Sequence, residues 1–348
     1  MTVKKRIVLT AVAIICLFVI LYLSQEFMGS YYSRIITLIG IYGIMAVSLT
    51  LVNGISGVFS LGHAGFIAVG AYTSALLTLS PQQKEITFII EKLVWPFNSI
   101  QLPFFWATLI GGIVAAIFAL VIGWPSLRLT GDYFAIATLG FAEIIRIFAL
   151  NMNSLTNGAL GLKALPDHTN IWASWGWLLV TVACVTSLAY SSFGRALRAI
   201  REDRVAAQAM GINVFKHQLM AFVVGGFFAG ISGSLYAHWL STIDPRTNTI
   251  GIMLTFNVLI MIVLGGLGSI TGAIIGGALF AFLSEWLRFL EGPMNILGFK
   301  IMGITGLRML VFSSLFVVIM IFWPRGIMGR REFSWDGLAS LFKRRDRK

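Results

Sequence analysis

Two ionisable residues interrupt an apolar stretch of this sequence, and their spacing allows them to interact. Glu143 and Arg146 are three residues apart, so they share one face of a helix and can pair there. Ionisable groups inside a membrane span are costly unless they pair or face water, which makes both residues functional candidates. Two interpretations stay open: a structural pair that fixes helix packing, or a carboxylate that lines a path through the membrane.

The densest group of charges lies in residues 194–212, where small apolar and charged residues alternate at helical spacing. The apolar face of this helix is predicted to hold Ala196, Ala199 and Ile200, and the charged face Arg195, Arg198 and Glu202. Gly211 is suited to end the helix. Such a helix could transmit force to a cytosolic partner. The alternative is a solvated connector whose arginines only set the topology of the chain.

His63 follows a glycine-rich turn and lies close in sequence to the polar residues Asn53 and Ser60. All three are candidates to line a path. A hydrogen-bonded structural role is the simpler interpretation for a lone His, and the other two residues could satisfy the backbone of a broken helix. No second His or carboxylate stands at metal-ligand spacing from His63, so no metal site is expected.

The sequence carries no pattern typical of catalysis or phosphate binding. It lacks the Gly-x-x-x-x-Gly-Lys-[Ser/Thr] motif, and no Ser/His/Asp or paired-carboxylate arrangement can be recognised. We therefore predict no catalytic residues, no enzyme activity and no cofactor bound by this chain. If ATP drives its action, a separate ATPase must bind the nucleotide.

The elements that must position these residues are membrane helices. The chain is 57% hydrophobic and only 11% charged, whereas about a quarter of a soluble protein is charged. A helix needs ~20 apolar residues to cross a bilayer, and the ten candidates are residues 7–23, 35–52, 64–79, 104–123, 133–150, 172–190, 219–239, 250–264, 268–290 and 307–323. The third and eighth are short enough to be re-entrant or broken, so eight or nine full spans also fit. The predicted fold is an all-α polytopic membrane protein.

The distribution of the 26 Lys and Arg residues predicts the orientation of these spans. With a cytoplasmic N-terminus, ten spans place 17 basic residues in cytoplasmic segments and 6 in external loops. This bias is expected of an inner-membrane protein whose termini are both cytoplasmic. No basic face indicates nucleic-acid binding. Residues 1–30 would form an N-terminal segment with the first span, 31–325 the core, and 326–348 a basic tail suited to anionic lipid.

Glycines recur at a spacing of four in two of the predicted spans. Gly226 and Gly230 fall in one of them, and Gly268, Gly272 and Gly276 form a ladder in another. Small residues at this spacing let helices approach closely in lipid. We expect them to serve packing within the chain; the alternative is a seam with a second membrane subunit.

Four segments of the sequence carry a family resemblance. Residues 53–66 read NGISGVFSLGHAGF, residues 128–146 RLTGDYFAIATLGFAEIIR, residues 194–211 GRALRAIREDRVAAQAMG, and residues 263–269 VLGGLGS. In this order they are similar to elements of the branched-chain amino-acid ABC permease family of LivM type. The resemblance covers roughly residues 40 to 325.

Within the 194–212 loop, the resemblance extends to a general permease motif, EAA-(x)3-G, that seats in the ATPase. Ala206, Ala207 and Gly211 keep its spacing, but Val205 stands in place of its Glu. The charge of that Glu must therefore be dispensable or be supplied by residues earlier in the loop, namely Arg201, Glu202 or Asp203. The predicted ATPase-coupling loop comprises Gly194, Arg195, Arg198, Arg201, Glu202, Asp203, Ala206, Ala207 and Gly211.

The resemblance implies the permease subunit of an ABC importer in the cytoplasmic membrane. It implies a second permease subunit of LivH type, two cytosolic ABC ATPases on the 194–212 loop, and an external binding protein delivering leucine, isoleucine or valine. Glu143 would then lie near the ammonium group of the substrate. A related urea or short-amide permease is the nearest alternative. A stand-alone secondary transporter, or a membrane-embedded enzyme, would be a different class.

Overall fold

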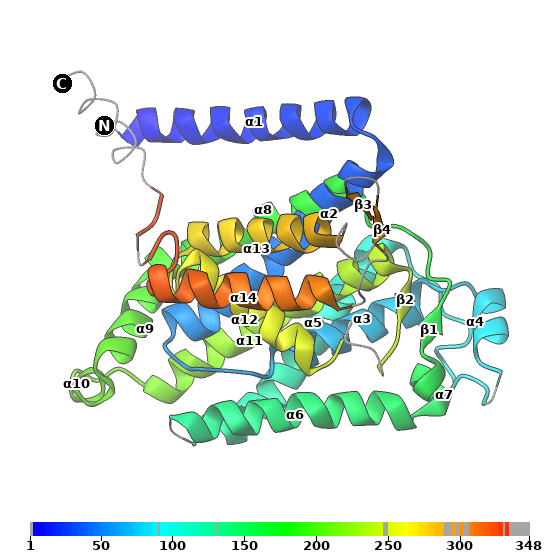
Figure 1. Ribbon diagram of the computed structural model, residues 1–348. Coiled ribbons are helices and arrows are strands. Elements are labelled where there is room, and N and C mark those ends of the chain that lie inside the picture. The colour runs from blue at the N-terminus through cyan, green and yellow to red at the C-terminus, as the bar shows by residue number, and fades with distance from the viewer. Residues whose placement is uncertain are drawn as a thin grey trace.

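The structure is a computed structural model that describes residues 3–89, 91–129, 131–245, 250–288, 294–296, 299–301, 306–329 and 331–333. Helices dominate it (Figure 1). The apolar helices are α1 (Val3–Phe27), α2 (Ser30–Leu49), α3 (His63–Thr78), α5 (Phe104–Ser126), α6 (Asp132–Asn151), α8 (Ile171–Tyr190), α11 (Val214–Leu240), α12 (Ile252–Gly265), α13 (Ile270–Trp286) and α14 (Leu307–Phe322). Each of the ten apolar segments predicted above falls on one of these helices, which confirms the all-α membrane fold.

Shorter elements connect the apolar helices. They are the π-helix η1 (Thr50–Ile55), α4 (Pro81–Thr87), α7 (Asn153–Thr156), the 3-10 helix η2 (Gly158–Leu160), α9 (Ser192–Glu202), α10 (Arg204–Ala209) and the strands β1 (Leu162–Lys163), β2 (Thr242–Ile243), β3 (Met294–Ile296) and β4 (Phe299–Ile301). The strands form two antiparallel pairs, with Leu162 opposite Ile243 in the first and Asn295 opposite Lys300 in the second.

Among the described residues, six helices are long and apolar enough to cross a membrane alone: α1, α2 continued by η1, α5, α6, α8 and α11. The chain bends by 119° between α3 and α4, and α12 and α13 are shorter apolar helices. The shortness expected for the third and eighth segments is therefore real. Each of these shorter helices packs against longer neighbours, α3 on α11 and α13 on α2.

Helix α11 forms the centre of the bundle and packs against α5, α3 and α2. Its predicted glycines make these contacts close: a Cβ atom on Gly226 would lie 2.5 Å from the Cβ of Ala119, and one on Gly230 2.5 Å from the Cβ of Ala115. Gly272 and Gly276 of α13 face α12, and a Cβ on Gly272 would lie 2.5 Å from the Gly265 carbonyl oxygen. These four glycines thus contact helices of their own chain.

The glycine ladder predicted from Gly268 to Gly276 is wrong at its first member. Gly268 lies before α13 in a turn, with φ +94°, a conformation that favours glycine. The helix begins only at Ile270, because the Ser269 side chain accepts a hydrogen bond from the Gly272 amide and acts as its N-cap.

Both ends of the described chain lie at the same end of the bundle. Helix α1 begins at the end where α9 and α10 lie (Figure 1). After α14, the amide of Ile327 donates to the Leu264 carbonyl oxygen and that of Met328 to Gly265, at the end of α12 on the same side. This arrangement is what an even number of spans requires. Most of the basic tail predicted over residues 326–348 falls on residues 334–348, outside the described residues.

The opposite end of the bundle is held together by a buried lysine. Lys84 of α4 is 2% exposed, and its Nζ atom donates to the carbonyl oxygens of Phe97 (2.7 Å) and Ile100 (2.5 Å). Burial lowers the pKa of this ammonium group. Lys84 therefore ties α4 to the backbone at Phe97 and Ile100.

Candidate functional site

The connection between α2 and α3 is a break inside the membrane bundle. Helix α2 widens into the π-helix η1, and the backbone then turns at Gly57, where φ is +74°. Asn53 replaces the lost helical bonds: its Nδ2 donates to the Ser60 carbonyl oxygen, and its Oδ1 accepts from the Ser60 amide, both at 3.1 Å. π-helical turns are frequent at functional sites, so this break is a candidate moving part.

His63 is the first residue of α3 and is 2% exposed. Its Nε2 lies 2.8 Å from the Ser48 hydroxyl, a hydrogen bond that joins α3 to α2. Ahead of it, the amide of Leu61 donates to the Thr138 hydroxyl of α6 at 3.1 Å. Asn53 and Ser60 thus close the break on itself, while His63 and the Leu61 amide tie it to α2 and α6. No local pattern in the sequence indicated that Thr138 takes part.

Helices α9 and α10 form the loop between α8 and α11. The sequence predicted one helix here, but Asp203 breaks it by accepting hydrogen bonds from the amides of Val205 (2.8 Å) and Ala206 (3.0 Å), which starts α10. Gly211 ends α10 with φ +80°. The Gly211 amide donates to Gln208 and the Ile212 amide to Ala207, the Schellman arrangement expected of a terminating glycine.

The buried face of α9 differs from the predicted one. Gly194, Leu197 and Ile200 are buried, whereas Ala199 is exposed and Ala196 half-buried. The reason is that α9 lies against α8 and α11, and these neighbours select which of the two weakly apolar faces turns inward. In α10, Ala207 is buried and Val205, which stands in place of the motif's Glu, is 74% exposed.

Arg201 connects α9 to the helix break. Its Nη1 donates to the Gly54 carbonyl oxygen at 2.7 Å, and its Nη2 donates to the Glu202 carboxylate at 3.0 Å. The packing is close, because a Cβ on Gly57 would lie 2.5 Å from the Cγ of Arg201. A side chain of the loop therefore reaches a carbonyl oxygen in the last turn of the π-helix. By contrast, Arg198 donates to Ala189 of α8, and Arg195 is exposed.

The Gly268 turn meets the same place, and a C-terminal residue holds it there. A Cβ on Gly268 would lie 3.1 Å from the Nη1 of Arg201. The Glu332 carboxylate accepts from the amides of Ile270 (2.6 Å) and Thr271 (3.1 Å), which caps the first turn of α13. Sequence reasoning missed Glu332, because a capping residue 62 positions after the first residue of its helix leaves no local pattern.

We expect Glu332→Ala to destabilise the chain modestly. Loss of a helix cap costs about 1 kcal/mol, which lowers the midpoint of thermal unfolding by a few degrees. Scanning fluorimetry of the purified protein in detergent measures this shift. Glu332→Gln keeps one acceptor oxygen and should lose less, and Glu26→Ala on exposed α1 should lose nothing. Equal midpoints for Glu332→Ala and the unchanged protein would contradict the capping role.

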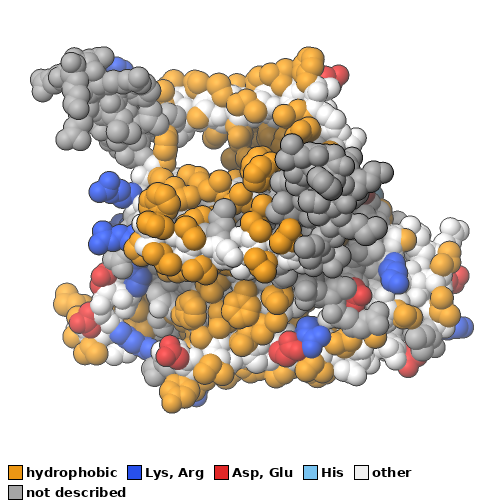
Figure 2. Space-filling model, in the orientation of Figure 1, with side chains coloured by type: hydrophobic (Ala, Val, Ile, Leu, Met, Phe, Trp, Pro, Cys, Tyr) orange, Lys and Arg blue, Asp and Glu red, His pale blue; other side chains and the backbone are white. Residues whose placement is uncertain are grey.

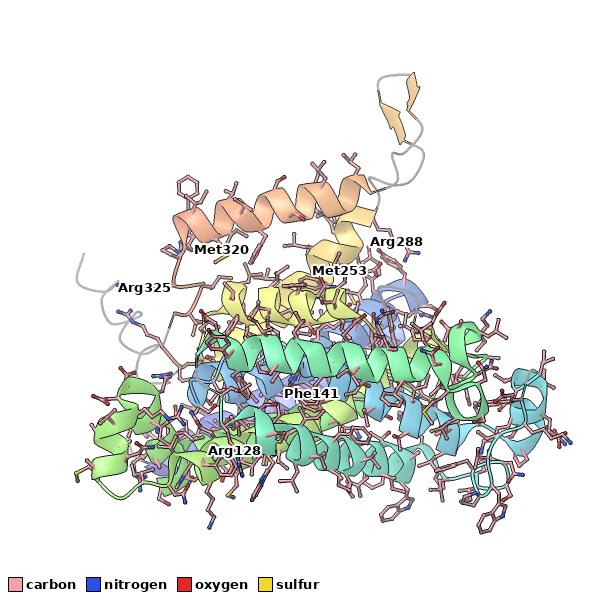
Figure 3. All side chains as sticks on the ribbon, turned by 90° about the horizontal axis from the view of Figure 1, so that it is seen from below. Arg128, Phe141, Met253, Arg288, Met320 and Arg325 are labelled. Carbon is pink, nitrogen blue, oxygen red and sulfur yellow. The ribbon has the colours of Figure 1, made fainter. Side chains whose placement is uncertain are left out.

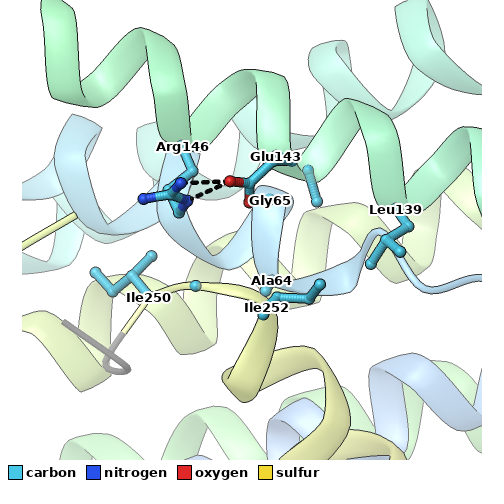
Figure 4. Close-up of a pocket in the computed structure, with 9 residues that line it drawn as sticks. Ala64, Gly65, Leu139, Glu143, Arg146, Ile250 and Ile252 are labelled. Atoms are coloured by element: carbon cyan, nitrogen blue, oxygen red, sulfur yellow. Dashed lines mark hydrogen bonds and ion pairs between the residues drawn. The ribbon is translucent and has the colours of Figure 1, made fainter. Parts of the chain in front are cut away.

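Glu143 and Arg146 pair on α6, as their spacing allowed. The Nε of Arg146 donates to Glu143 Oε1 at 2.8 Å, and its Nη2 donates to the same oxygen. Its Nη1 also donates to the Pro245 carbonyl oxygen at 3.2 Å. The pair borders a small cavity between α3, α6 and α12, lined by Ala64, Gly65, Leu139, Ala142, Ile250, Gly251 and Ile252 (Figure 4). The two charges lie beside the first turn of α3, close to the helix break.

Comparisons with known proteins identify the family. A family model described as branched-chain amino acid transport system / permease component matches residues 31–322. The chain is 31% identical to the high-affinity branched-chain amino acid transport system permease protein LivM of Escherichia coli, over 94% of this chain and 76% of that protein. It is 28% identical to the LivH permease protein of Salmonella typhimurium, over 89% of this chain and 96% of LivH. No solved structure matches it.

The matched region begins at α2 and ends at the last residue of α14, so it includes the helix break, α9, α10 and the ion pair. The apolar helices and these relatives make the protein a multi-pass protein of the inner membrane. The chain belongs to the family of branched-chain amino acid transport permeases.

Proposed function

We propose that this chain is the permease subunit of an ATP-driven importer for leucine, isoleucine and valine. The observation that carries the proposal is the 31% identity to LivM over 94% of the chain. The chain provides the membrane path and binds no cofactor, and ATP is bound by separate ATPase subunits. A second permease subunit, an external binding protein and two cytosolic ATPases complete the importer.

The ATPases dock on α9 and α10, with the ends of the described chain on the same, cytoplasmic side. Two features support this assignment: the Ala206-Ala207 and Gly211 spacing of the docking motif, and the exposure of Val205 (74%) and Met210 (82%) on α10. Closure of the ATPases on ATP would tilt α9, and Arg201 would carry that movement to Gly54 at the helix break. The transport path would then switch from outward- to inward-facing.

Uptake of labelled leucine tests the proposal. Cells with and without the gene are compared, each challenged with excess unlabelled isoleucine, valine or urea. We expect leucine uptake that depends on the gene and on the binding protein, and that isoleucine and valine block but urea does not. Unchanged leucine uptake, together with gene-dependent urea uptake, would overturn the amino-acid assignment in favour of a urea or amide permease. Uptake that persists without the ATPases would indicate a secondary transporter.

Glu143→Gln tests whether the ion pair lines the path. The change keeps the shape of the side chain but removes the charge that would face the substrate ammonium group, an interaction worth ~1.5–3 kcal/mol. We expect leucine uptake to fall roughly tenfold or more, with little change in the amount of assembled complex. A parallel loss of uptake and assembly would instead assign the pair to helix packing.

A further inference from the structure

A cavity lies at the end of the bundle that carries α9 and α10. It has a volume of about 160 Å³ and forms where the helix break, the α5–α6 connection, α10 and α11 meet. Its lining residues come from all of these elements: Gly57, Val58, Phe59, Leu127, Leu129, Gly131, Asp132, Phe134, Arg204 and Gln218. We call it the Asp132 cavity. Seen from below, Arg128 of the α5–α6 connection lies toward the same end of the bundle (Figure 3).

Gln218 of α11 is a buried polar residue that lines this cavity. It is 8% exposed, and its side-chain amide has no hydrogen-bond partner among the described residues. A buried amide without partners is costly, because it has given up its hydrogen bonds to water. An occupant of the cavity that offers a hydrogen-bond donor or acceptor would satisfy this amide.

The cavity also holds one basic and one acidic side chain that do not bind each other. Arg204 is the first residue of α10 and Asp132 the first of α6. Neither side chain forms an ion pair or hydrogen bond within the part of the chain that the structure describes. In the cavity at Glu143, by contrast, the carboxylate is bound by Arg146. Acidic and basic side chains gather over α9, α10 and the start of α6 (Figure 2), so a charged occupant would meet both signs here.

The remaining walls of the cavity are apolar. Leu127 and Phe134 are buried, and Phe59 and Leu129 are exposed large hydrophobic residues at the same place. An apolar cavity of ~150 Å³ holds a benzene molecule, so this one has space for a branched aliphatic side chain. Apolar walls with a few well-placed polar groups are typical of small-molecule sites.

Two opposite charges, one amide and apolar walls match the parts of an α-amino acid with an apolar side chain. Its carboxylate would bind Arg204 and its ammonium group Asp132, while Gln218 can hydrogen-bond to either. A phosphate ion would be repelled by Asp132, and a simple cation by Arg204. The zwitterionic headgroup of phosphatidylethanolamine offers the same two charges, and it is therefore the second source of this chemistry.

We propose that the Asp132 cavity is a second amino-acid site, which binds leucine, isoleucine or valine from the cytoplasmic side. The choice of these three amino acids rests on the proposed function. The site is separate from the cavity at Glu143, because the two share no lining residue and Asp132 lies about 16 Å from Glu143 along α6. An occupant would join α10 to the helix break and to α6. Imported amino acid would then oppose the movement of α9 and α10 and slow further import.

Binding of labelled leucine to the purified importer, without its external binding protein, tests the site. We expect saturable binding that isoleucine and valine compete, and that Asp132→Asn and Arg204→Gln each weaken roughly tenfold or more. Asp167→Asn and Arg128→Gln remove exposed charges outside the cavity and should bind normally. Absence of saturable binding, or equal binding by all four variants, would overturn the site. Binding that only Glu143→Gln removes would overturn it too, and would assign the leucine to the other cavity.

Competition with glycerophosphoethanolamine separates the amino acid from the lipid headgroup. We expect this headgroup analogue not to compete at concentrations at which valine does, and the reverse result would overturn the amino-acid assignment. The site and the proposed function fail in different ways. Gene-dependent leucine uptake without leucine binding at the Asp132 cavity would overturn the site alone, whereas absence of gene-dependent leucine uptake would overturn the proposed function.

Uptake by proteoliposomes tests the effect of an occupant on transport. The importer is supplied with binding protein and labelled leucine outside and ATP inside, and vesicles preloaded with unlabelled leucine are compared with empty ones. Preloading should slow the initial uptake roughly twofold or more. Gln218→Leu, which keeps a side chain of similar size and replaces an unpartnered amide, should lose this slowing relative to its own empty vesicles. Equal slowing in the variant and the unchanged protein would overturn the effect on transport.

Discussion

Replacing Arg201 with Ala is expected to reduce leucine uptake roughly tenfold or more, while the chain still folds and enters the membrane. The substitution removes the donor at 2.7 Å from the Gly54 carbonyl oxygen and the packing against Gly57. An acceptor left unsatisfied at such a buried position costs ~1–3 kcal/mol. More importantly, α9 would lose its contact with the helix break, so a movement of α9 would no longer reach the path.

The test measures two quantities for the complete importer, leucine uptake and ATP hydrolysis, and compares them. Arg201→Ala should hydrolyse ATP without matching transport, and Arg201→Lys should recover part of the transport because it keeps one donor. Lys216→Ala removes an exposed cation near the start of α11, outside residues 194–212, and is the matched control that should transport normally. Equal losses from the two alanine variants would show that only the positive charge on this side of the bundle matters, and would refute the connection through Gly54.

The second large effect is expected from Gly230→Leu, which should prevent the chain from folding. A Cβ at this position would already lie 2.5 Å from the Cβ of Ala115 and 2.9 Å from the Gly111 carbonyl oxygen, so a leucine must force α11 and α5 apart. Overpacking of a tight core costs ~1–3 kcal/mol and sometimes more. Both contacts are to backbone or Cβ atoms of α5, and a change of side-chain rotamer cannot move these atoms aside.

Size-exclusion chromatography in mild detergent measures the folded fraction. We expect the monodisperse peak of Gly230→Leu to fall roughly tenfold or more, with Gly230→Ala intermediate. Gly140→Leu makes the same change at a glycine with open space around it, so it controls for the general cost of a larger side chain in a membrane helix. Normal recovery of Gly230→Leu would mean that α5 and α11 pack less closely than the structure indicates.

The membrane helices could be predicted from the sequence because hydrocarbon imposes one dominant requirement on them. A span must be apolar over most of its length, and all ten segments fall on helices whose ends differ from the prediction by a few residues. The sequence also allowed the prediction that Asn53 and Ser60 satisfy the backbone of a broken helix. Polar residues and glycines inside an apolar stretch are expected where the helical hydrogen bonds are interrupted.

Contacts between distant segments could not be predicted in the same way. The periodicity of α9 offered two similar faces, and only α8 and α11 decide that Leu197 and Ile200 turn inward. Gly268 continues a spacing of four, yet a serine cap ends the ladder before it. Likewise, the pairings of Arg201 with Gly54 and of Glu332 with Ile270 join positions 147 and 62 residues apart. No local pattern records such pairings.

Helix α12 is shorter than a full membrane span. Its 14 residues give a length of about 21 Å, against ~30 Å of hydrocarbon. Protein, water or lipid headgroups must therefore occupy the remaining depth at its outer end. That end, at Gly251 and Ile252, borders the cavity of Glu143 and Arg146. The short helix therefore ends beside this ion pair, and under the proposed function a substrate arriving from outside would travel a shorter distance to Glu143 than the full length of α6.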